Sequence, residues 1–265
     1  MIEFLGAVGK NFLQKLDYYG GIISLTVYSF FEVFRKHSFN QWRLFYVTAV
    51  KQVFFTAYQS IKNVFFVLIL VGAITSFVLF VSLEGLVSKD VVASIFIIVI
   101  FRELLPIIVI VIIIARSVSA IAVEIGNMTV NKEFDIFVSM GIDPLFFLVL
   151  PRIVGMVIST ILLLIIGAFI ILFLGPTSML LFSSADVSDL LEATFSKVSI
   201  ADLLLVFTKG VVSALFLPSI ASYHGFKTSS KNLVPVAATK GIIASLTFAI
   251  VVSVLVTVIF YIFVF

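Results

Sequence analysis

The sequence predicts an all-α integral membrane protein with five transmembrane helices. Its 265 residues are 62% hydrophobic and 12% charged, a composition outside the range of soluble globular domains. A bilayer core about 30 Å thick needs about 20 apolar residues in each helix that crosses it. Five segments meet this requirement, and they run over residues 63–83, 91–115, 150–174, 203–223 and 241–264.

Residues 1–62 precede the first span, and we expect them to form amphipathic helices in the membrane interface. Apolar residues recur at helical spacing from Ile2 to Tyr19, with Lys10 and Lys15 between them. A cytosolic helix that packs on the protein's own helices would show the same pattern. The sequence therefore divides into an N-terminal interfacial part and a five-helix transmembrane domain over residues 63–265.

Basic residues are unevenly shared among the loops and predict the orientation. They gather before the first span, between the second and third spans, and between the fourth and fifth. Segment 175–202 instead has one lysine and four acidic residues, and it carries the signals of a short external helix. The positive-inside rule thus predicts a cytoplasmic N-terminus and an external C-terminus. The basic residues serve topology here, so the high pI does not indicate a nucleic-acid partner.

Between the second and third spans, residues 124–150 form a polar segment with clear helix boundaries. Gly141 is placed to end one helix in the left-handed conformation, while Asp143 and Pro144 suit the N-cap and first position of the next. The first of these helices offers an apolar ridge at spacing i, i+3, i+6, formed by Phe134, Phe137 and Met140. We expect this ridge to contact a partner protein outside the bilayer.

Three charged residues lie inside apolar spans. Arg102 and Glu103 interrupt the second span, and Lys209 lies in the fourth. Each costs about 2.5–3.5 kcal/mol at a helix centre, so we expect these side chains to face protein or water. They would form a buried ion-pair cluster that fixes helix packing, a cavity lining that holds a polar or anionic headgroup, or both. Pro106 predicts a kink beside them because it cannot bond the carbonyl of Arg102.

Several chemistries find no support in the sequence. Cysteine is absent, and His37 and His224 lack the spacing of metal ligands, so we expect no metal site. No GxxxxGK[ST] phosphate loop, HExxH motif or Ser-His-Asp arrangement occurs. We therefore expect a chain that is not an enzyme and holds no cofactor of its own.

Two sequence blocks resemble the MlaE-type permease family. They are RELLPIIVIVIIIARSVSAIAVEIGNM at 102–128 and EFDIFVSMGIDPLFFLVLPRIV at 133–154. Members of this family are the membrane subunits of bacterial ABC transporters that work with Mce-domain proteins. The resemblance extends more weakly to residues 201–226 and to the N-terminal region.

The resemblance implies a homodimeric permease of the bacterial inner membrane, with a periplasmic C-terminus. Cytoplasmic ABC ATPase subunits would bind ATP and Mg, a periplasmic Mce-domain protein would receive or deliver lipid, and a STAS-domain subunit would accompany the ATPases. Phospholipid or a related lipid would move between the inner membrane and that carrier or the outer membrane. Lipid-cavity candidates are Arg102, Glu103 and Lys209, and ATPase-coupling candidates are Glu124, Glu133, Phe134, Asp135, Phe137, Met140, Gly141, Asp143 and Pro144.

The sequence departs from the family at two places. Lys132 and Glu133 stand where members often have Glu-Gln, and the last span, 241–264, lacks the aspartate that members often have. The sequence is also compatible with two other functions. One is an ion-gradient-coupled secondary transporter that uses Glu103 and Lys209, and the other is a membrane scaffold for a lipid-binding partner.

Overall fold

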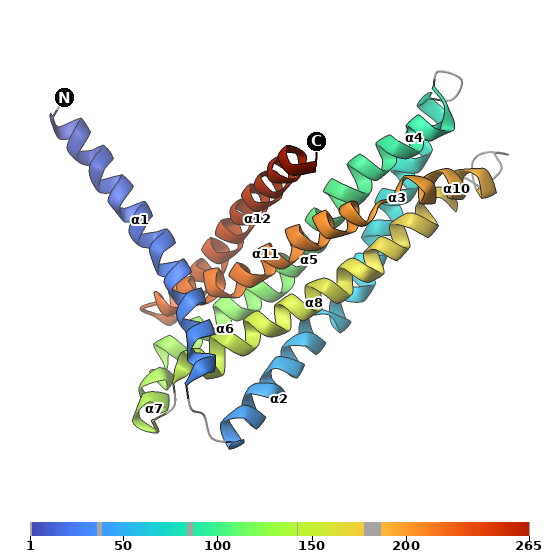
Figure 1. The fold of residues 1–265 in the computed structure, drawn as a ribbon. Helices are drawn as coiled ribbons and strands as arrows, with labels where there is room; N and C mark the ends of the chain where they lie inside the picture. Colours follow the sequence, from blue (N-terminus) through green and yellow to red (C-terminus); the bar gives the residue numbers. More distant parts are fainter. Residues whose placement is uncertain (1, 36–38, 84–86, 142, 178–186, 265) are drawn as a thin grey trace. The chain divides into compact units, whose positions relative to one another are not determined.

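A computed structural model describes residues 2–35, 39–83, 87–141, 143–177 and 187–264 (Figure 1). Side chains are described for fewer residues, and those of residues 2–16 lie outside the described set. Helices and helical turns, joined by short connections, make up this part of the chain, and it contains no strand. The all-α prediction is confirmed.

The α-helices follow one another along the chain with short irregular turns between them. In order they are α1 (Ile2–Phe31), α2 (Phe39–Thr56), α3 (Ile61–Leu83), α4 (Lys89–Phe96), α5 (Leu105–Ile113), α6 (Ser119–Val130), α7 (Glu133–Ser139), α8 (Leu150–Phe169), α9 (Gly175–Thr177), α10 (Val187–Lys197), α11 (Ile200–Phe226) and α12 (Val234–Val264). Helix α10 is the short helix predicted within segment 175–202.

Within the described residues, five helical stretches are long and apolar enough to cross a membrane, as predicted. They are Gln41–Leu79, Asp90–Val130, Leu145–Thr177, Ile200–Phe226 and Lys231–Phe263. The first stretch begins well before residue 63, because α2 continues through the 3-10 turn Tyr58–Ser60 into α3. Its 39 residues would extend about 58 Å as a straight helix, so part of it lies outside a bilayer core. The predicted interfacial location of residues 1–62 stays a prediction.

Some stretches are not regular α-helix. Residues Ile97–Leu104 form a π-helical segment directly before α5, and further π-helical turns follow at Ile114–Val118, Leu145–Val149 and Ile170–Leu174. Near Pro106, where the sequence predicts a kink, the helix is thus π-helical before the proline and α-helical from Leu105 on. Insertions of this kind often occur at functional sites, and this one contains Arg102 and Glu103.

The described chain divides into two compact units. The first unit comprises Met1–Gln52, Val118–Gly155 and Leu215–Ser245. Its aromatic core centres on Phe146, whose ring stacks on Phe45 and meets Trp42 edge to face, with centroids 5.5 Å apart in both pairs. Aromatic pairs in these geometries stabilise packing beyond the area they bury. This core fixes the start of the third apolar stretch against α2.

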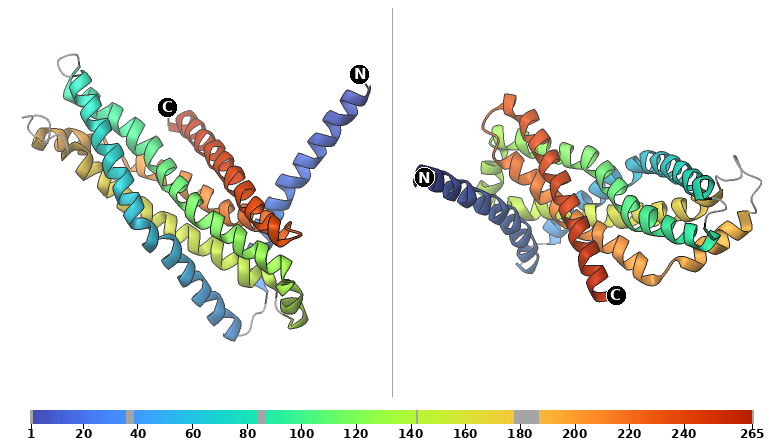
Figure 2. Two further views of the ribbon diagram at one scale, coloured as in Figure 1. Left: turned by 180° about the vertical axis from the view of Figure 1, so that it is seen from behind. Right: turned by 90° about the horizontal axis from the view of Figure 1, so that it is seen from above.

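The second unit comprises Val53–Ser117, Met156–Ala214 and Leu246–Phe265. Within it α3 and α4 lie side by side, as both views of Figure 2 show, and α10 packs against α4. Close approach of the helices depends on small residues. A Cβ at Gly167 would lie 2.6 Å from Cδ1 of Leu105 and 2.8 Å from Cδ1 of Leu68.

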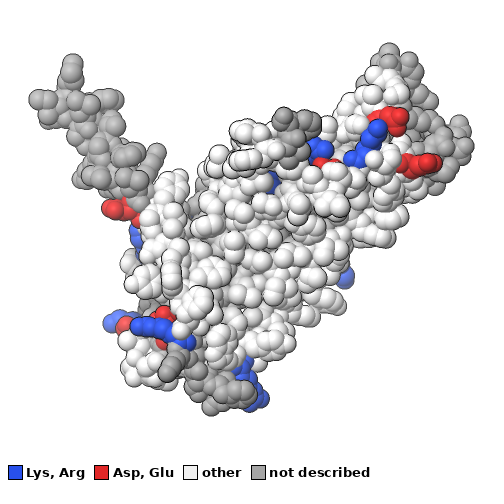
Figure 3. Space-filling view, viewed as in Figure 1, with Lys and Arg blue, Asp and Glu red and all other residues white. Residues whose placement is uncertain are grey.

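Large apolar side chains remain exposed on the outward surfaces of the long helices. Phe66 is 65% exposed and Ile250 is 58% exposed, although both lie in apolar stretches. Most of the surface visible in Figure 3 carries neither basic nor acidic side chains. Such a surface suits lipid rather than water.

Candidate functional site

The start of α11 holds an acidic side chain in a fixed position. Ser199 and Asp202 cap the helix reciprocally: the Ser199 N–H donates to Oδ2 of Asp202 at 2.9 Å, and the Asp202 N–H donates to Oγ of Ser199 at 3.3 Å. This arrangement satisfies two backbone donors at the helix terminus. It also leaves Oδ1 of the buried Asp202 available for another partner.

That partner is Arg102. Its Nε lies 2.7 Å from Oδ1 of Asp202, and its Nη1 donates to the hydroxyl of Tyr261 at 3.2 Å. Asp202 was not among the predicted site residues. Its position seven residues before Lys209, on the same helical face, was the signal that could have identified it.

Lys209 and Glu103 form the second ion pair of the cluster. Nζ of Lys209 lies 2.7 Å from Oε2 of Glu103, and the hydroxyl of Thr257 donates to Oε1 at 3.0 Å. Lys209 also donates to the main-chain carbonyl of Arg102 at 3.0 Å. This is the carbonyl that Pro106 cannot bond in the usual i to i−4 pattern, so the lysine satisfies an acceptor exposed by the proline.

The structure thus brings together all three predicted cavity residues and adds Asp202, within one compact unit. We call the two pairs, Arg102–Asp202 and Lys209–Glu103, the charged cluster. The lysine and aspartate side chains are fully buried, whereas those of Arg102 and Glu103 are 16% and 35% exposed. The geometry shows Glu103 and Lys209 as an ion pair, while Arg102 pairs with Asp202 rather than with another predicted residue. The exposed part of Glu103 leaves one polar group of the cluster accessible from outside the chain.

The polar segment between the second and third stretches has the boundaries that the sequence predicts. Gly141 has φ +70°, and Oδ1 of Asp143 accepts a hydrogen bond of 2.8 Å from the Leu145 N–H. Pro144 opens the next helix. The structure adds one feature that was not predicted: Lys132, just before α7, is also left-handed, with φ 58°. Two left-handed residues therefore flank α7.

The apolar side chains that α7 exposes differ in part from those of the predicted ridge. Phe134 packs edge to face on Phe226, with centroids 5.0 Å apart, so the chain itself covers much of it. Phe137 is half-buried, and Met140 is 58% exposed. The other exposed apolar side chains of this helix are those of Ile136 and Val138. Asp135 is exposed among them, and Glu133 accepts a hydrogen bond from Asn131 at 3.2 Å.

Two arginines, Arg152 and Arg35, form ion pairs with residues of this segment. Oε1 of the exposed Glu124 lies 2.8 Å from Nη2 of Arg152, whose side chain is only 4% exposed. Arg35 bonds Glu32 at 3.1 Å and approaches Asp143 at 4.0 Å, beside a cavity of about 210 Å³ that Gly141 also lines. The hydrogen bond to Glu32 raises the pKa of Arg35 above its usual range, so the guanidinium stays charged.

Comparison with known proteins identifies the family of this chain. Residues 49–259 match the family described as Permease MlaE. The chain belongs to the MlaE permease family. The match includes the charged cluster and the polar segment 124–150 with helix α7, which we call the α7 segment. Helix α1 and Tyr261 lie outside the match.

Relatives of this MlaE permease have been found in several bacteria. A probable ABC transporter permease protein of Rickettsia typhi is 22% identical over 226 residues, which cover 85% of each chain. That of Rickettsia prowazekii is 23% identical over the same share. One from Synechocystis is 30% identical over 158 residues, covering 58% of this chain and 56% of the relative. The MlaE permease described here is thus a multi-pass membrane protein and an ABC permease subunit.

Proposed function

We propose that this permease moves phospholipid or a related lipid between the bacterial inner membrane and a periplasmic Mce-domain carrier or the outer membrane. It would act as a homodimer, with its N-terminus in the cytoplasm and its C-terminus in the periplasm. Separate ABC ATPase subunits, with a STAS-domain subunit beside them, would supply the energy. ATP and Mg would bind to the ATPases.

The charged cluster is the observation that carries this proposal. A phospholipid headgroup is polar and often zwitterionic, and it needs paired charges to leave water. The cluster offers a carboxylate and a guanidinium that are partly exposed, Glu103 and Arg102, on apolar helices whose outer faces suit acyl chains. Lys209 and Asp202 lie behind them and hold both groups in place. The same unit would therefore offer charged groups to the headgroup of an amphiphile and apolar helix surface to its acyl chains.

The α7 segment supports an ATPase partner. Two left-handed residues, Lys132 and Gly141, bound this short helix, which lies in the polar segment between the second and third apolar stretches. Its exposed apolar side chains are those of Ile136, Val138 and Met140, and Asp135 is exposed directly before Ile136. Such a surface suits a groove on a soluble protein. The stretch Asp90–Val130, which leads to α7, also carries Arg102 and Glu103, so covalent continuity links the proposed docking segment to the proposed lipid site.

Reconstitution of the permease with its ATPase and carrier tests the proposal. Liposomes that contain a fluorescent phospholipid should transfer it to the carrier when ATP is added, and an ionophore that collapses ion gradients should leave the transfer unchanged. Transfer that follows an ion gradient without ATP would indicate a secondary transporter instead. A permease that binds the carrier but transfers no lipid would be a scaffold.

Docking is tested separately. Asp135→Ala and Phe137→Ala should weaken copurification of the ATPase, whereas Asp90→Ala, an exposed acid at the start of α4, should not. Full ATPase binding and full lipid transfer by both α7 variants would show that the docking surface lies elsewhere.

A further inference from the structure

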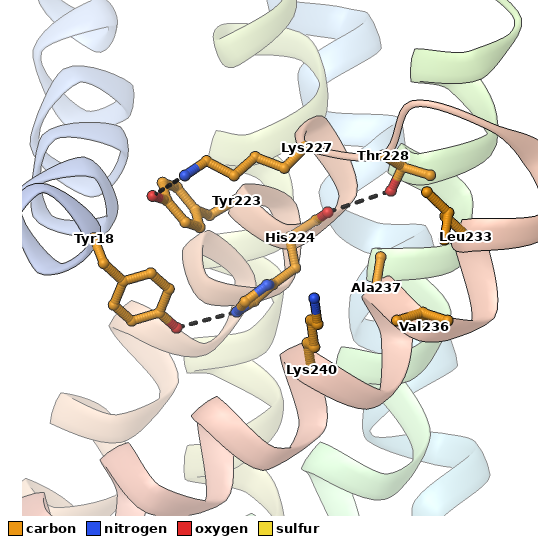
Figure 4. A pocket seen from close by; sticks show the side chains of 9 residues that line it. All are labelled: Tyr18, Tyr223, His224, Lys227, Thr228, Leu233, Val236, Ala237 and Lys240. Atoms are coloured by element: carbon orange, nitrogen blue, oxygen red, sulfur yellow. Dashed lines mark hydrogen bonds between the residues drawn. The ribbon is translucent and has the colours of Figure 1, made fainter. Parts of the chain in front are cut away.

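A second polar site lies in the first unit, where α1 meets the end of α11 and the start of α12. It is a cavity of about 290 Å³, and Figure 4 shows the nine side chains that line it. None of the nine is acidic. Six of them carry cationic or hydrogen-bonding groups: Tyr18, Tyr223, His224, Lys227, Thr228 and Lys240.

Aromatic rings hold two of the basic groups in position. Nζ of Lys227 donates to the hydroxyl of Tyr223 and lies 4.2 Å from the centre of that ring. The hydroxyl of Tyr18 lies 3.0 Å from Nε2 of His224. Lys240 extends into the space beside His224 (Figure 4). Among the described residues, neither Lys227 nor Lys240 forms an ion pair with an acid, so the two ammonium groups keep their charge available for a ligand.

Three apolar side chains line the other side of the cavity, next to Thr228 (Figure 4). They are Leu233, Val236 and Ala237, which belong to the turn before α12 and to its first turns. A small soluble anion would gain nothing from these side chains. A ligand with an anionic headgroup and a hydrocarbon part would use both sides.

We propose that this cavity binds the phosphate group of an anionic phospholipid, as a site distinct from the charged cluster. The cluster contains two anions as well as two cations, whereas this cavity offers cations without a compensating acid. Lys227 and Lys240 belong to the basic residues that predict the cytoplasmic side, where the lipid surface is negative. The proposal does not depend on which lipid the transporter moves, because binding here is measured without transport.

Binding to the purified full-length chain in neutral detergent tests the site. The probes are dioctanoyl phosphatidylglycerol, dioctanoyl phosphatidylcholine and inorganic phosphate, titrated separately by microscale thermophoresis. The variants are Lys227→Gln with Lys240→Gln, and the control Lys231→Gln, which removes an exposed lysine that does not line the cavity. Each lysine near an anionic headgroup contributes about a factor of five in affinity, so the double variant should bind phosphatidylglycerol roughly 25-fold more weakly.

The control variant should bind as the wild type does, and Lys227→Arg with Lys240→Arg should retain binding because it keeps both charges. Equal affinity for phosphatidylcholine, an unchanged affinity in the double glutamine variant, or an equal loss in the Lys231→Gln control would overturn the proposal. Inorganic phosphate that binds as tightly as phosphatidylglycerol would overturn the lipid assignment. Size-exclusion profiles identify misfolded variants, and the single variants then replace the double one, each with roughly a fivefold expected loss.

Discussion

Lys209 donates a hydrogen bond of 3.0 Å to the main-chain carbonyl of Arg102, four residues before Pro106. One buried lysine therefore serves two acceptors, because its ammonium also pairs with Glu103. The proline exposes a carbonyl in an apolar helix, and the lysine satisfies it. The lysine therefore contributes both to the helix backbone near Pro106 and to the ion pair with Glu103. We expect its substitution to affect both.

Replacing Lys209 with Met should destabilise the permease, because Glu103 loses its cation and the Arg102 carbonyl loses a donor. Breaking a buried ion pair from one side costs about 3–5 kcal/mol, and the partial exposure of Glu103 places this case toward the lower end. Adding Glu103→Leu removes the unpaired acid and should recover part of the loss. Thermal unfolding in detergent measures both. A double variant no more stable than the single one would contradict the pairing.

Asp202→Asn and Asp202→Ala separate two roles of one side chain. Asparagine keeps an oxygen that accepts from the Ser199 N–H but loses the charge that faces Arg102, whereas alanine loses both. The alanine variant should therefore be less stable than the asparagine variant by about 0.5–2 kcal/mol, the usual contribution of a helix cap. Unfolding midpoints give the comparison. Identical midpoints would mean that the cap does not contribute to stability.

Thr257→Val should lower stability by about 1 kcal/mol through loss of the hydrogen bond to Glu103. The substitution hardly changes volume, so packing is kept. Thr239→Val, on the same helix, removes a hydroxyl that bonds only the carbonyl of Pro235 among the contacts described, and it should have little effect. If lipid transfer depends on the position of Glu103, the first variant should slow it and the second should not. Equal effects would argue against a specific role for Thr257.

Gly141→Ala should weaken ATPase copurification. A Cβ at this residue meets no atom within 4 Å, so the effect arises from the backbone alone, at φ +70°. A left-handed alanine costs about 1–2 kcal/mol, whereas asparagine adopts this conformation more readily. Gly141→Asn is therefore the matched control and should retain more binding. Equal binding by the wild type and both variants would show that the turn does not position α7 for its partner.

Gly225→Ala should destabilise the first unit. A Cβ there would lie 2.7 Å from both Cβ and Cγ2 of Ile125, and the Cβ of Ile125 cannot move without moving its helix. Overpacking of this kind costs about 1–3 kcal/mol. Gly20→Ala is the control, because a Cβ at Gly20 meets nothing within 4 Å and alanine favours a helix. A lower unfolding temperature for the first variant alone is expected, and equal temperatures would contradict close packing at Gly225.

The sequence predicted those parts of the fold that depend on local chemistry. The number of apolar spans follows when the length of each apolar segment is compared with the thickness of the bilayer core. The turn at Gly141 and Asp143 follows from the backbone preferences of these single residues. The left-handed Lys132 was not predicted, because lysine has no local preference for that conformation. The π-helical segment around Arg102 escaped prediction for a similar reason: an inserted residue leaves no clear mark in an apolar pattern.

The site was predicted less completely, because its pairs depend on which helix faces meet. Arg102, Glu103 and Lys209 were identifiable as charges in apolar spans, but Asp202 lies at the end of a span, where an acid is ordinary. The partial coverage of Phe134 by Phe226 likewise joins residues about ninety positions apart. Periodicity gives the spacing along α7 but not the face that the rest of the chain covers.

The charged cluster also has an electrical consequence. It holds two cations and two anions in close pairs, and α12 adds the hydroxyls of Thr257 and Tyr261 in place of an acid. Moving one elementary charge across a potential of 100 mV involves about 2.3 kcal/mol, but a group with no net charge does no such work. A helix movement that carries both pairs together would proceed equally well in energised and de-energised membranes.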